Sequence, residues 1–202
     1  MNRAFQGHQE PAVASLIQVI AGSDYDLVNT AQRGDQQSLV TLYERYYDRV
    51  YRFALSRLGS VADAEDLTQD TFLKMVDKLS SFSWKGSPFS AWLFRIAHNG
   101  VVDTVRRRSR RGLQVPMEAA QVAVAASYEG GMDDTLLLND LVNAMGRLTQ
   151  AQQEVLSLRF GAELSVSEAA QALGKAEGTV KATQFQALQA LRKILAAERS
   201  LQ

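Results

Sequence analysis

Residues 36–58 read QQSLVTLYERYYDRVYRFALSRL, and this segment decides the fold class. Most of its apolar side chains recur at steps of three or four residues, which places them on one face of a helix. No strand alternation appears in this segment or elsewhere in the first half of the chain. The chain is therefore predicted to be all-α. The apolar positions of the segment are Leu39, Leu42, Tyr43, Tyr46, Val50, Phe53, Ala54 and Leu58.

Helical patterns on both sides of this segment fall into two groups. Between them lie residues 112–134, an acidic stretch with Pro116, Gly130-Gly131 and small side chains that is typical of a flexible linker. We predict an N-terminal extension over 1–24 and two small helical domains over 25–111 and 135–199. The other expected helices are a short one from Tyr25, then 63–79 and 88–111, and in the second domain helices beginning at Asp133, Thr149, Ser165 and Glu177, with Gly174 as the turn before the last one.

Composition excludes several classes of site. The 202 residues contain no cysteine and only two histidines, so a disulfide framework, a thiolate metal site and a multi-histidine metal site are all ruled out. No run approaches the ~18 apolar residues that a membrane span needs, and we expect a cytoplasmic protein without a metal or cofactor. Glu65, Asp66 and Asp70 could form a carboxylate dyad, but acids in a first helical turn are usually solvated. A catalytic role is not expected.

The charge balance of 22 basic and 22 acidic side chains hides a strong asymmetry. Residues 95–111 contain six arginines and one acid, whereas residues 112–146 contain five acids and no lysine or arginine. A basic segment followed directly by an acidic one suggests a nucleic-acid contact beside a segment that must avoid nucleic acid.

The helix expected over 88–111 shows how such a contact could be built. Phe89, Leu93, Ile96 and Ala97 cover one face and would anchor it to the domain. Arginines hold phosphates and aromatic faces stack on exposed bases, so the polar stripe on the other face favours nucleic-acid binding. The alternative is that Trp92 belongs to the core and the arginines only solubilise the helix end. The stripe consists of Trp92, Arg95, Asn99, Arg106 and Arg110, with Val102 and Asp103 nearby.

The pair of helices on either side of Gly174 matches a helix-turn-helix, whose second helix enters the DNA major groove. Helical hairpins are common, so this spacing alone leaves DNA binding open. In the last helix we expect Val180, Leu188, Leu191, Ile194 and Leu195 to face inward, and Lys181, Phe185, Gln186, Gln189 and Lys193 to face outward.

At these residues the chain resembles bacterial RNA polymerase sigma factors of the small extracytoplasmic-function (ECF) group. The resemblance covers residues 25–111 and 135–197, with several long motifs in the same order. They include DAEDLTQDTF (63–72), WLFRIAHN (92–99), LSVSEAAQALG (164–174) and GTVK (178–181). The resemblance implies binding to core RNA polymerase, through its β and β′ subunits, and to promoter DNA. It also implies restraint by an anti-sigma factor.

The resemblance also implies roles for individual residues. An acidic helix surface would bind a coiled coil of the largest polymerase subunit, through Asp66, Gln69, Asp70 and Phe72. The loop 81–87 and the helix after it would open the −10 promoter element and hold a flipped base, through Phe82, Trp84, Trp92, Arg95, Asn99, Asp103, Arg106, Arg107 and Arg110. The helix-turn-helix would read the −35 element, through Lys175, Thr179, Lys181, Gln184, Phe185 and Gln186.

One part of the sequence departs from the family pattern. Ala176 stands where the family commonly has a capping serine, and Thr183, Phe185 and Gln186 stand where it commonly has arginine or histidine. Either the last helix reads an unusual sequence, or a partner occupies its surface. A stand-alone helix-turn-helix regulator is the alternative function, although it would need a dimerisation element and no heptad seam is present.

Overall fold

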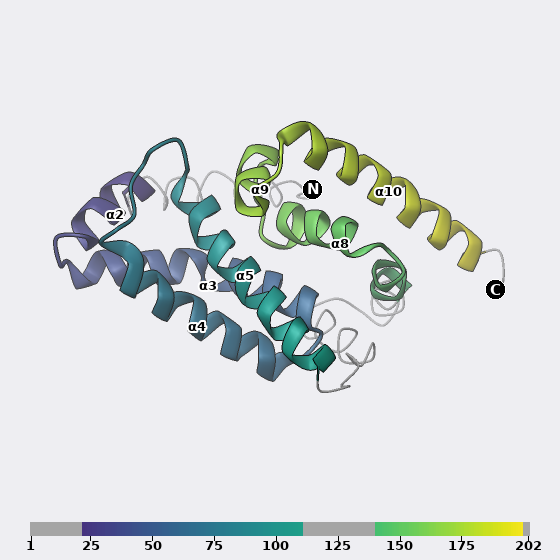
Figure 1. Cartoon of the computed structure of the whole chain (residues 1–202), viewed down its shortest axis with the longest axis horizontal. Helices are drawn as coiled ribbons and strands as arrows, with labels where there is room; N and C mark the ends of the chain where they lie inside the picture. The colour runs from purple at the N-terminus through teal and green to yellow at the C-terminus, as the bar shows by residue number, and fades with distance from the viewer. Residues whose placement is uncertain (1–21, 111–139, 200–202) are drawn as a thin grey trace, which may run out of the picture. The chain divides into compact units, whose positions relative to one another are not determined.

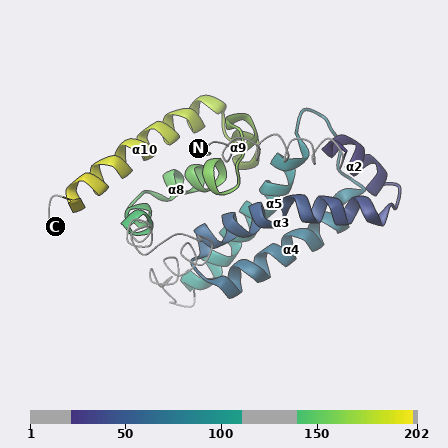
Figure 2. The ribbon, with the colours of Figure 1, turned by 180° about the vertical axis from the view of Figure 1, so that it is seen from behind.

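The computed structural model describes residues 22–110 and 140–199, and within these ranges every regular element is a helix (Figure 1; Figure 2). The prediction of an all-α chain is confirmed. The elements are α2 (Asp24–Ala31), α3 (Gln36–Leu58), α4 (Val61–Leu79), α5 (Phe89–Arg110), α8 (Gln150–Leu156), the π-helix η1 (Ser157–Gly161), α9 (Val166–Leu173) and α10 (Glu177–Arg199). Residues 140–146 are helical as well.

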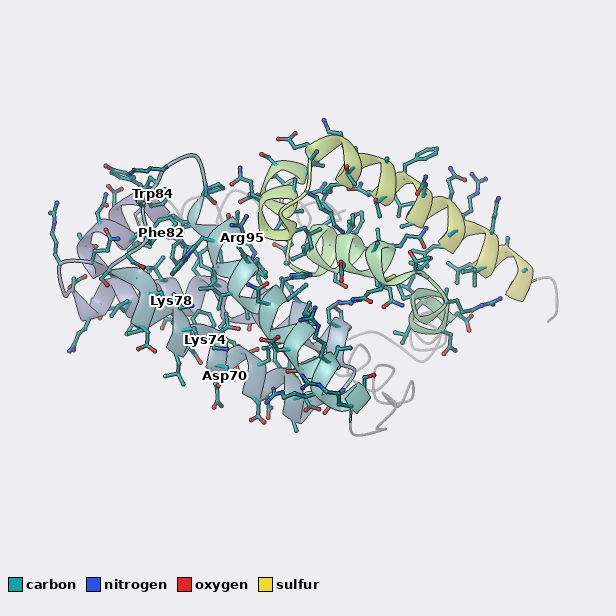
Figure 3. All side chains as sticks on the ribbon, viewed as in Figure 1. Asp70, Lys74, Lys78, Phe82, Trp84 and Arg95 are labelled. Atoms are coloured by element: carbon teal, nitrogen blue, oxygen red, sulfur yellow. The ribbon has the colours of Figure 1, made fainter. Side chains whose placement is uncertain are left out.

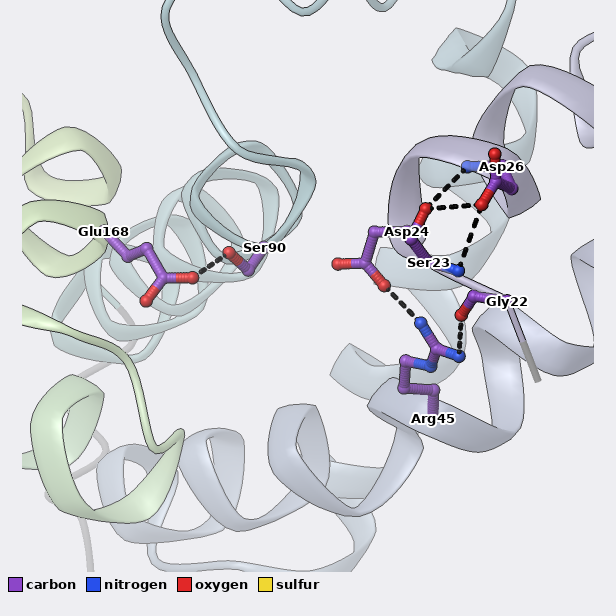
Figure 4. Close-up of polar contacts among 7 residues, drawn as sticks. All are labelled: Gly22, Ser23, Asp24, Asp26, Arg45, Ser90 and Glu168. Carbon is purple, nitrogen blue, oxygen red and sulfur yellow. Dashed lines mark hydrogen bonds and ion pairs between the residues drawn. The ribbon is translucent and has the colours of Figure 1, made fainter. Parts of the chain in front are cut away.

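The chain divides into two compact units, residues 1–45 and 46–202, and α3 contains the boundary. In the first unit, Ser23 caps α2 by accepting a hydrogen bond from the Asp26 backbone N–H, and the Asp26 carboxylate completes the capping box (Figure 4). Arg45 of α3 binds the start of α2 through its guanidinium group. Its guanidinium lies 2.6 Å from Asp24 Oδ1 and donates to the Gly22 carbonyl at 2.9 Å.

In the second unit, aromatic rings join the rest of α3 to α4 and α5. The Tyr47 ring stacks on Phe72 of α4, with centroids 6.4 Å apart, and Phe53 meets Phe94 of α5 edge to face at 5.9 Å. Phe53 and Phe94 are fully buried. Helices α4 and α5 pack so closely at Gly100 that a Cβ there would collide with the Leu67 side chain. A larger residue at position 100 would force the buried Leu67 side chain to move, so Gly100 allows the present close packing of α5 on α4.

The start of α4 differs from the expectation. The helix begins at Val61, and Ser60 caps it by accepting from the Asp63 backbone N–H. The Asp63 carboxylate instead accepts a hydrogen bond from the Arg108 guanidinium. The same guanidinium also donates to the Leu58 carbonyl at 2.9 Å. One of the clustered arginines of α5 is therefore a structural link between three helix ends.

The C-terminal helices confirm the predicted helix-turn-helix. Thr149 and Ser165 begin α8 and α9 with complete capping boxes, and Gly174 ends α9 in the left-handed conformation at φ 65°. Their core consists of Ala144, Leu148, Leu156, Ala187 and Leu191. Leu188 was expected to face inward but is 43% exposed, because Ala187 takes the inward position in this turn of α10.

The π-helix η1 was not predicted from the sequence. Ala162 N–H donates to the Ser157 carbonyl five residues earlier, at 2.9 Å, in place of a regular α-helical bond. Arg159 of this turn donates to the Gln184 side chain of α10 at 2.9 Å. This hydrogen bond joins the π-turn to the last helix.

Several predictions fall outside the described residues. They concern most of the N-terminal extension, the linker 112–134, Arg111 and the helix start at Asp133. Across residues 22–110 and 140–199, none of the helices combines the length and the apolar character needed to cross a bilayer.

Candidate nucleic-acid interface

An aromatic cluster fixes the loop between α4 and α5. The Phe82 ring lies 5.1 Å from Trp84, 5.0 Å from Trp92 and 5.7 Å from Phe89, measured between centroids. Phe82 and Phe89 are buried, whereas Trp84 and Trp92 are half-buried. The first two rings thus anchor the loop to α5. The two tryptophans keep part of their rings at the surface, where a base could stack.

The polar stripe predicted on α5 is largely exposed. Arg95, Asn99, Asp103, Arg106, Arg107 and Arg110 all have exposed side chains. Arg108 lies apart from them, half-buried against Asp63. The described part of the arginine cluster thus offers three exposed guanidinium groups, those of Arg106, Arg107 and Arg110, and one structural group.

Helix α5 also contacts α9. The Ser90 hydroxyl donates to the Glu168 carboxylate (Figure 4). One turn later, the Arg95 guanidinium donates to the backbone carbonyl of Gln171. The sequence had suggested no contact between these helices.

A buried carboxylate lies beside this contact. Glu154 of α8 is only 8% exposed, and its Oε1 lies 3.8 Å from His98 Nε2 of α5. The Gln150 amide donates to it at 3.0 Å, and Lys175 Nζ lies 3.7 Å from Oε2. The His98 imidazole lowers the pKa of Glu154 most, with help from Gln150 and Arg57 and against the effect of burial, to about 2. Glu154 is therefore an anionic centre where α5, α8 and the turn of the helix-turn-helix meet.

Helix α4 presents a mixed acidic and apolar surface. Asp66, Gln69 and Asp70 are exposed, as their predicted role requires, whereas Phe72 is buried and stacks on Tyr47. Leu73 continues the exposed acidic face one turn further and is 65% exposed. The sequence analysis missed Leu73, although an apolar side chain three residues after Asp70 was the available signal.

Lysines lie on the same helix. Figure 3 shows Lys74 and Lys78 along α4 after Asp70, on the way to the loop that holds Phe82 and Trp84. Both lysines are exposed. After Asp70 the surface of α4 thus carries two lysines together with the exposed Asp77.

The last helix presents its predicted outer face to solvent. Lys175, Thr179, Lys181, Phe185 and Gln186 are exposed, as are Gln189 and Lys193. Phe185 is 65% exposed, which is uncommon for a phenylalanine side chain. Gln184 is half-buried because its side chain accepts the hydrogen bond from Arg159. Among the described residues, no three histidine, aspartate or glutamate side chains gather into a possible metal site.

Comparison with known families gives matches over both domains. Residues 42–111 match the family model of sigma-70 region 2, and residues 144–193 match that of sigma-70 region 4. The region 2 match contains the aromatic loop and the polar stripe of α5, and the region 4 match contains the helix-turn-helix.

Curated proteins similar to this chain are also sigma factors. The chain is 38% identical over 174 residues to the ECF RNA polymerase sigma factor BldN of Streptomyces coelicolor, which covers 84% of this chain and 65% of that protein. It is 30% identical to SigD of Mycobacterium tuberculosis, over 82% of this chain and 81% of that one. It is 29% identical to SigW of Bacillus subtilis, over 83% and 94%.

Solved structures include CnrH in complex with the cytosolic domain of CnrY, with 27% identity, a TM-score of 0.64 and coverage of 86% of this chain and 97% of that one. The sigma factor RpoE of Bartonella quintana, in complex with the anti-sigma factor NepR, has 27% identity, a TM-score of 0.59 and coverage of 76% and 94%. With matches of this extent in both domains, the chain belongs to the ECF group of RNA polymerase sigma factors.

Proposed function

We propose that this chain binds core RNA polymerase, brings it to a promoter and opens the DNA there, with no catalytic group of its own. The observation that carries the proposal is the pairing, on one α5 helix, of a buried apolar face with an exposed stripe of guanidinium and amide groups beside an aromatic loop. The matches to sigma-70 regions 2 and 4 support it.

Polymerase binding is assigned to the exposed face of α4. Asp66, Gln69 and Asp70 would pair with basic groups on a polymerase coiled coil, and the exposed Leu73 would pack against its apolar surface. Phe72 would act by holding α4 in place through its stacking on Tyr47. Such a mixed surface suits a helical partner, because an apolar centre supplies affinity and surrounding charges supply orientation.

Opening of the −10 element is assigned to the loop and α5. A flipped base needs an aromatic face for stacking and donors for its edge. Trp84 and Trp92 offer partly exposed rings beside Arg95 and Asn99. Further along the stripe, Asp103, Arg106, Arg107 and Arg110 are exposed on a helix that packs against α4. The arginines among them would hold phosphates and position the strand.

Reading of the −35 element is assigned to α9 and α10. Lys175, Thr179, Lys181, Phe185 and Gln186 are the exposed groups of this motif that a major groove would meet, and Gln184 lies among them. Few of these groups are charged, so we infer that the second domain adds sequence preference more than electrostatic affinity.

We also propose an anti-sigma partner that acts in the cytoplasm, where the polymerase works. Support comes from CnrH and RpoE, whose structures are described as complexes with the cytosolic domain of CnrY and with the anti-sigma factor NepR. A stand-alone regulator is not favoured, because the matches cover both sigma regions.

The test is transcription from purified components. Genomic fragments are incubated with bacterial core polymerase, with or without the chain, and transcript starts are mapped. New starts that share upstream motifs, present only when the chain is added, are the expected result. Binding of the chain to duplex DNA without polymerase, and no chain-dependent starts with it, would favour the stand-alone regulator instead.

A further inference from the structure

A cavity of about 700 Å³ lies beside the end of α3 and the second half of α5, and its other walls come from α8, η1, α10 and the helical residues 140–146. Its volume falls within the range of about 300–1,000 Å³ that is typical of sites for small organic ligands. The surfaces assigned above to polymerase and to promoter DNA include none of the residues that line it. The cavity therefore needs an explanation of its own.

Most of the cavity wall is apolar. Val105, Met145 and Leu156 line the cavity, together with Phe160 and Leu188. Phe160 and Leu188 are 57% and 43% exposed, although a close-packed core would cover such side chains. An apolar group in the cavity would remove this surface from water, which is favourable. The wall therefore favours a ligand with an apolar body.

One cation lies in this wall. Among the described residues that line the cavity, Arg57 alone has a charged side chain. Its Nη1 donates to Gln153 Oε1 at 2.9 Å, whereas its Nε is buried and has no hydrogen-bond partner among the described residues. Burial lowers the pKa of Arg57, against the opposite effect of Glu154, because water solvates the guanidinium poorly there. An arginine keeps its charge even so, and Arg57 is therefore a cation with an unused donor.

The Ser157 hydroxyl is a second unused group. Ser157 is 3% exposed, and its Oγ has no hydrogen-bond partner within the described part of the chain. It follows Gln153, the residue that binds Arg57, by one helical turn, so both side chains leave the helix on the same side. Ser157 and Arg57 also both line the cavity. Two groups that a ligand oxygen could satisfy thus lie near Gln153.

The acidic side chain that acts on Arg57 is engaged elsewhere. Glu154 is not among the residues that line the cavity. Its carboxylate oxygens lie 3.8 Å from His98 Nε2 and 3.7 Å from Lys175 Nζ. The charge that the described part of the cavity wall presents is therefore positive, and it would attract a single anionic group.

We propose that this cavity binds a small organic carboxylate, with the apolar body of the ligand against Met145, Phe160 and Leu188 and its carboxylate against Arg57. A carboxylate accepts several hydrogen bonds, so it can accept from the Arg57 guanidinium and from the Ser157 hydroxyl. A neutral apolar ligand would leave both groups unsatisfied. A nucleotide carries several negative charges, and these would meet one cation and a largely apolar wall.

The test is isothermal titration calorimetry of the free, full-length chain with ligands that share one alkyl chain. Octanoate has a carboxylate, octanol is neutral and octylamine is a cation at neutral pH. We expect one saturable site for octanoate, an affinity about tenfold lower for octanol because the charged hydrogen bond is lost, and no binding of octylamine, which Arg57 would repel. Equal affinities for the three ligands, or no saturable binding of octanoate, would overturn the proposal.

Arg57→Gln tests the anionic end of the site. It should lower the affinity for octanoate about tenfold and leave the affinity for octanol within about twofold, because only octanoate uses the charge. A purely structural role of Arg57 would change both affinities together. Arg192→Gln, at an exposed arginine of α10 that does not line the cavity, is the matched control and should bind both ligands like wild type. An equal loss for both ligands, or none for octanoate, would overturn the assignment.

Leu188→Trp tests the apolar end. Leu188 is 43% exposed, so a larger side chain there can fill the cavity without a clash in the core, and it should abolish binding of octanoate and octanol. Val76→Trp, at a position of α4 that is 50% exposed and outside the cavity, is the matched control. Circular dichroism should show wild-type helix content in both variants. Unchanged octanoate binding in Leu188→Trp would place the ligand outside the cavity and overturn the proposal.

An acidic peptide is the competing occupant. A peptide of alternating aspartate and leucine should bind more weakly than octanoate, because its backbone groups would find few partners on a largely apolar wall. Tighter binding of the peptide, lost in both Arg57→Gln and Leu188→Trp, would overturn the small-molecule assignment and indicate a protein partner. None of these measurements needs polymerase or DNA, so their outcome is independent of the proposed function.

Discussion

The Arg95 guanidinium on α5 donates a hydrogen bond to the Gln171 backbone carbonyl on α9. A side chain assigned to promoter DNA is thus engaged by the second domain in the free chain. Its neighbour Asn99, one turn further along, is exposed on the same stripe. The two positions should therefore respond alike in promoter opening but differently in the free chain.

Arg95→Ala and Asn99→Ala are both expected to impair promoter opening while polymerase binding stays normal. Both side chains are exposed, and both lie away from the buried face of α5, so folding should be unchanged. Loss of a few kcal/mol of contacts to a flipped base should leave the duplex closed. Permanganate reactivity of unpaired thymines measures the opening, and wild-type reactivity in both variants would refute the assignment.

Salt dependence should separate the two domains. Replacing Arg106 and Arg110 with glutamine should flatten the dependence of promoter binding on salt more than replacing Lys181 and Lys193. Each phosphate contact contributes about 0.9 to the slope of log K against log salt on duplex DNA. The measurement is polymerase-complex binding to promoter DNA from low to moderate salt. A larger change from the lysine pair would show that α10 supplies most of the electrostatic affinity.

Ala176→Ser is expected to stabilise the chain. The Ala176 carbonyl accepts from Val180 N–H at 3.2 Å, which makes it the N-cap of α10, but its methyl group cannot accept a hydrogen bond from the first turn. A serine there should add about 1 kcal/mol to the free energy of unfolding. Urea unfolding of wild type and variant measures this. A serine variant no more stable than wild type would contradict the prediction.

The Glu154 carboxylate should make stability dependent on acid pH. Its pKa of about 2 in the folded chain lies below its ordinary value of 4.5, so its contribution is complete above pH 4.5 and falls as the pH approaches 2. Glu154→Gln should thus cost up to about 3 kcal/mol at pH 7 and less than half of that at pH 3. Urea unfolding at both pH values tests this. Asp77→Asn is the control, and an equal cost of Glu154→Gln at both pH values would refute it.

Local signals in the sequence were sufficient to predict most of the helices. The three- and four-residue spacing of 36–58 predicted α3 to its final boundaries, and the capping signals at Thr149 and Ser165 predicted the starts of α8 and α9. Such signals act within one or two turns, so they are readable without the fold. Ser60 was missed as a cap because the acids that follow it gave a stronger first-turn signal.

The features that the sequence did not predict depend on contacts between residues far apart in the chain. No role was predicted for Arg108 individually, and only the approach of Asp63, 45 residues earlier, makes this arginine structural. The hydrogen bonds from α5 to α9 and from α3 to residues 153–163 join residues separated by about 75 to 115 positions, and no periodicity encodes such pairs. Leu188 faces solvent because the neighbouring Ala187 takes the buried position in this turn of α10.

The measurement that tests the account most directly is co-elution with core RNA polymerase on a sizing column. Wild-type chain should elute with the enzyme, whereas Asp66→Arg should elute alone, since Asp66 is exposed in the first turns of α4 and the substitution reverses its charge. Circular dichroism should show equal helix content in both chains. Co-elution of Asp66→Arg at the wild-type ratio would contradict the polymerase-binding surface assigned to α4, and a wild-type chain that never co-elutes would contradict the proposed function itself.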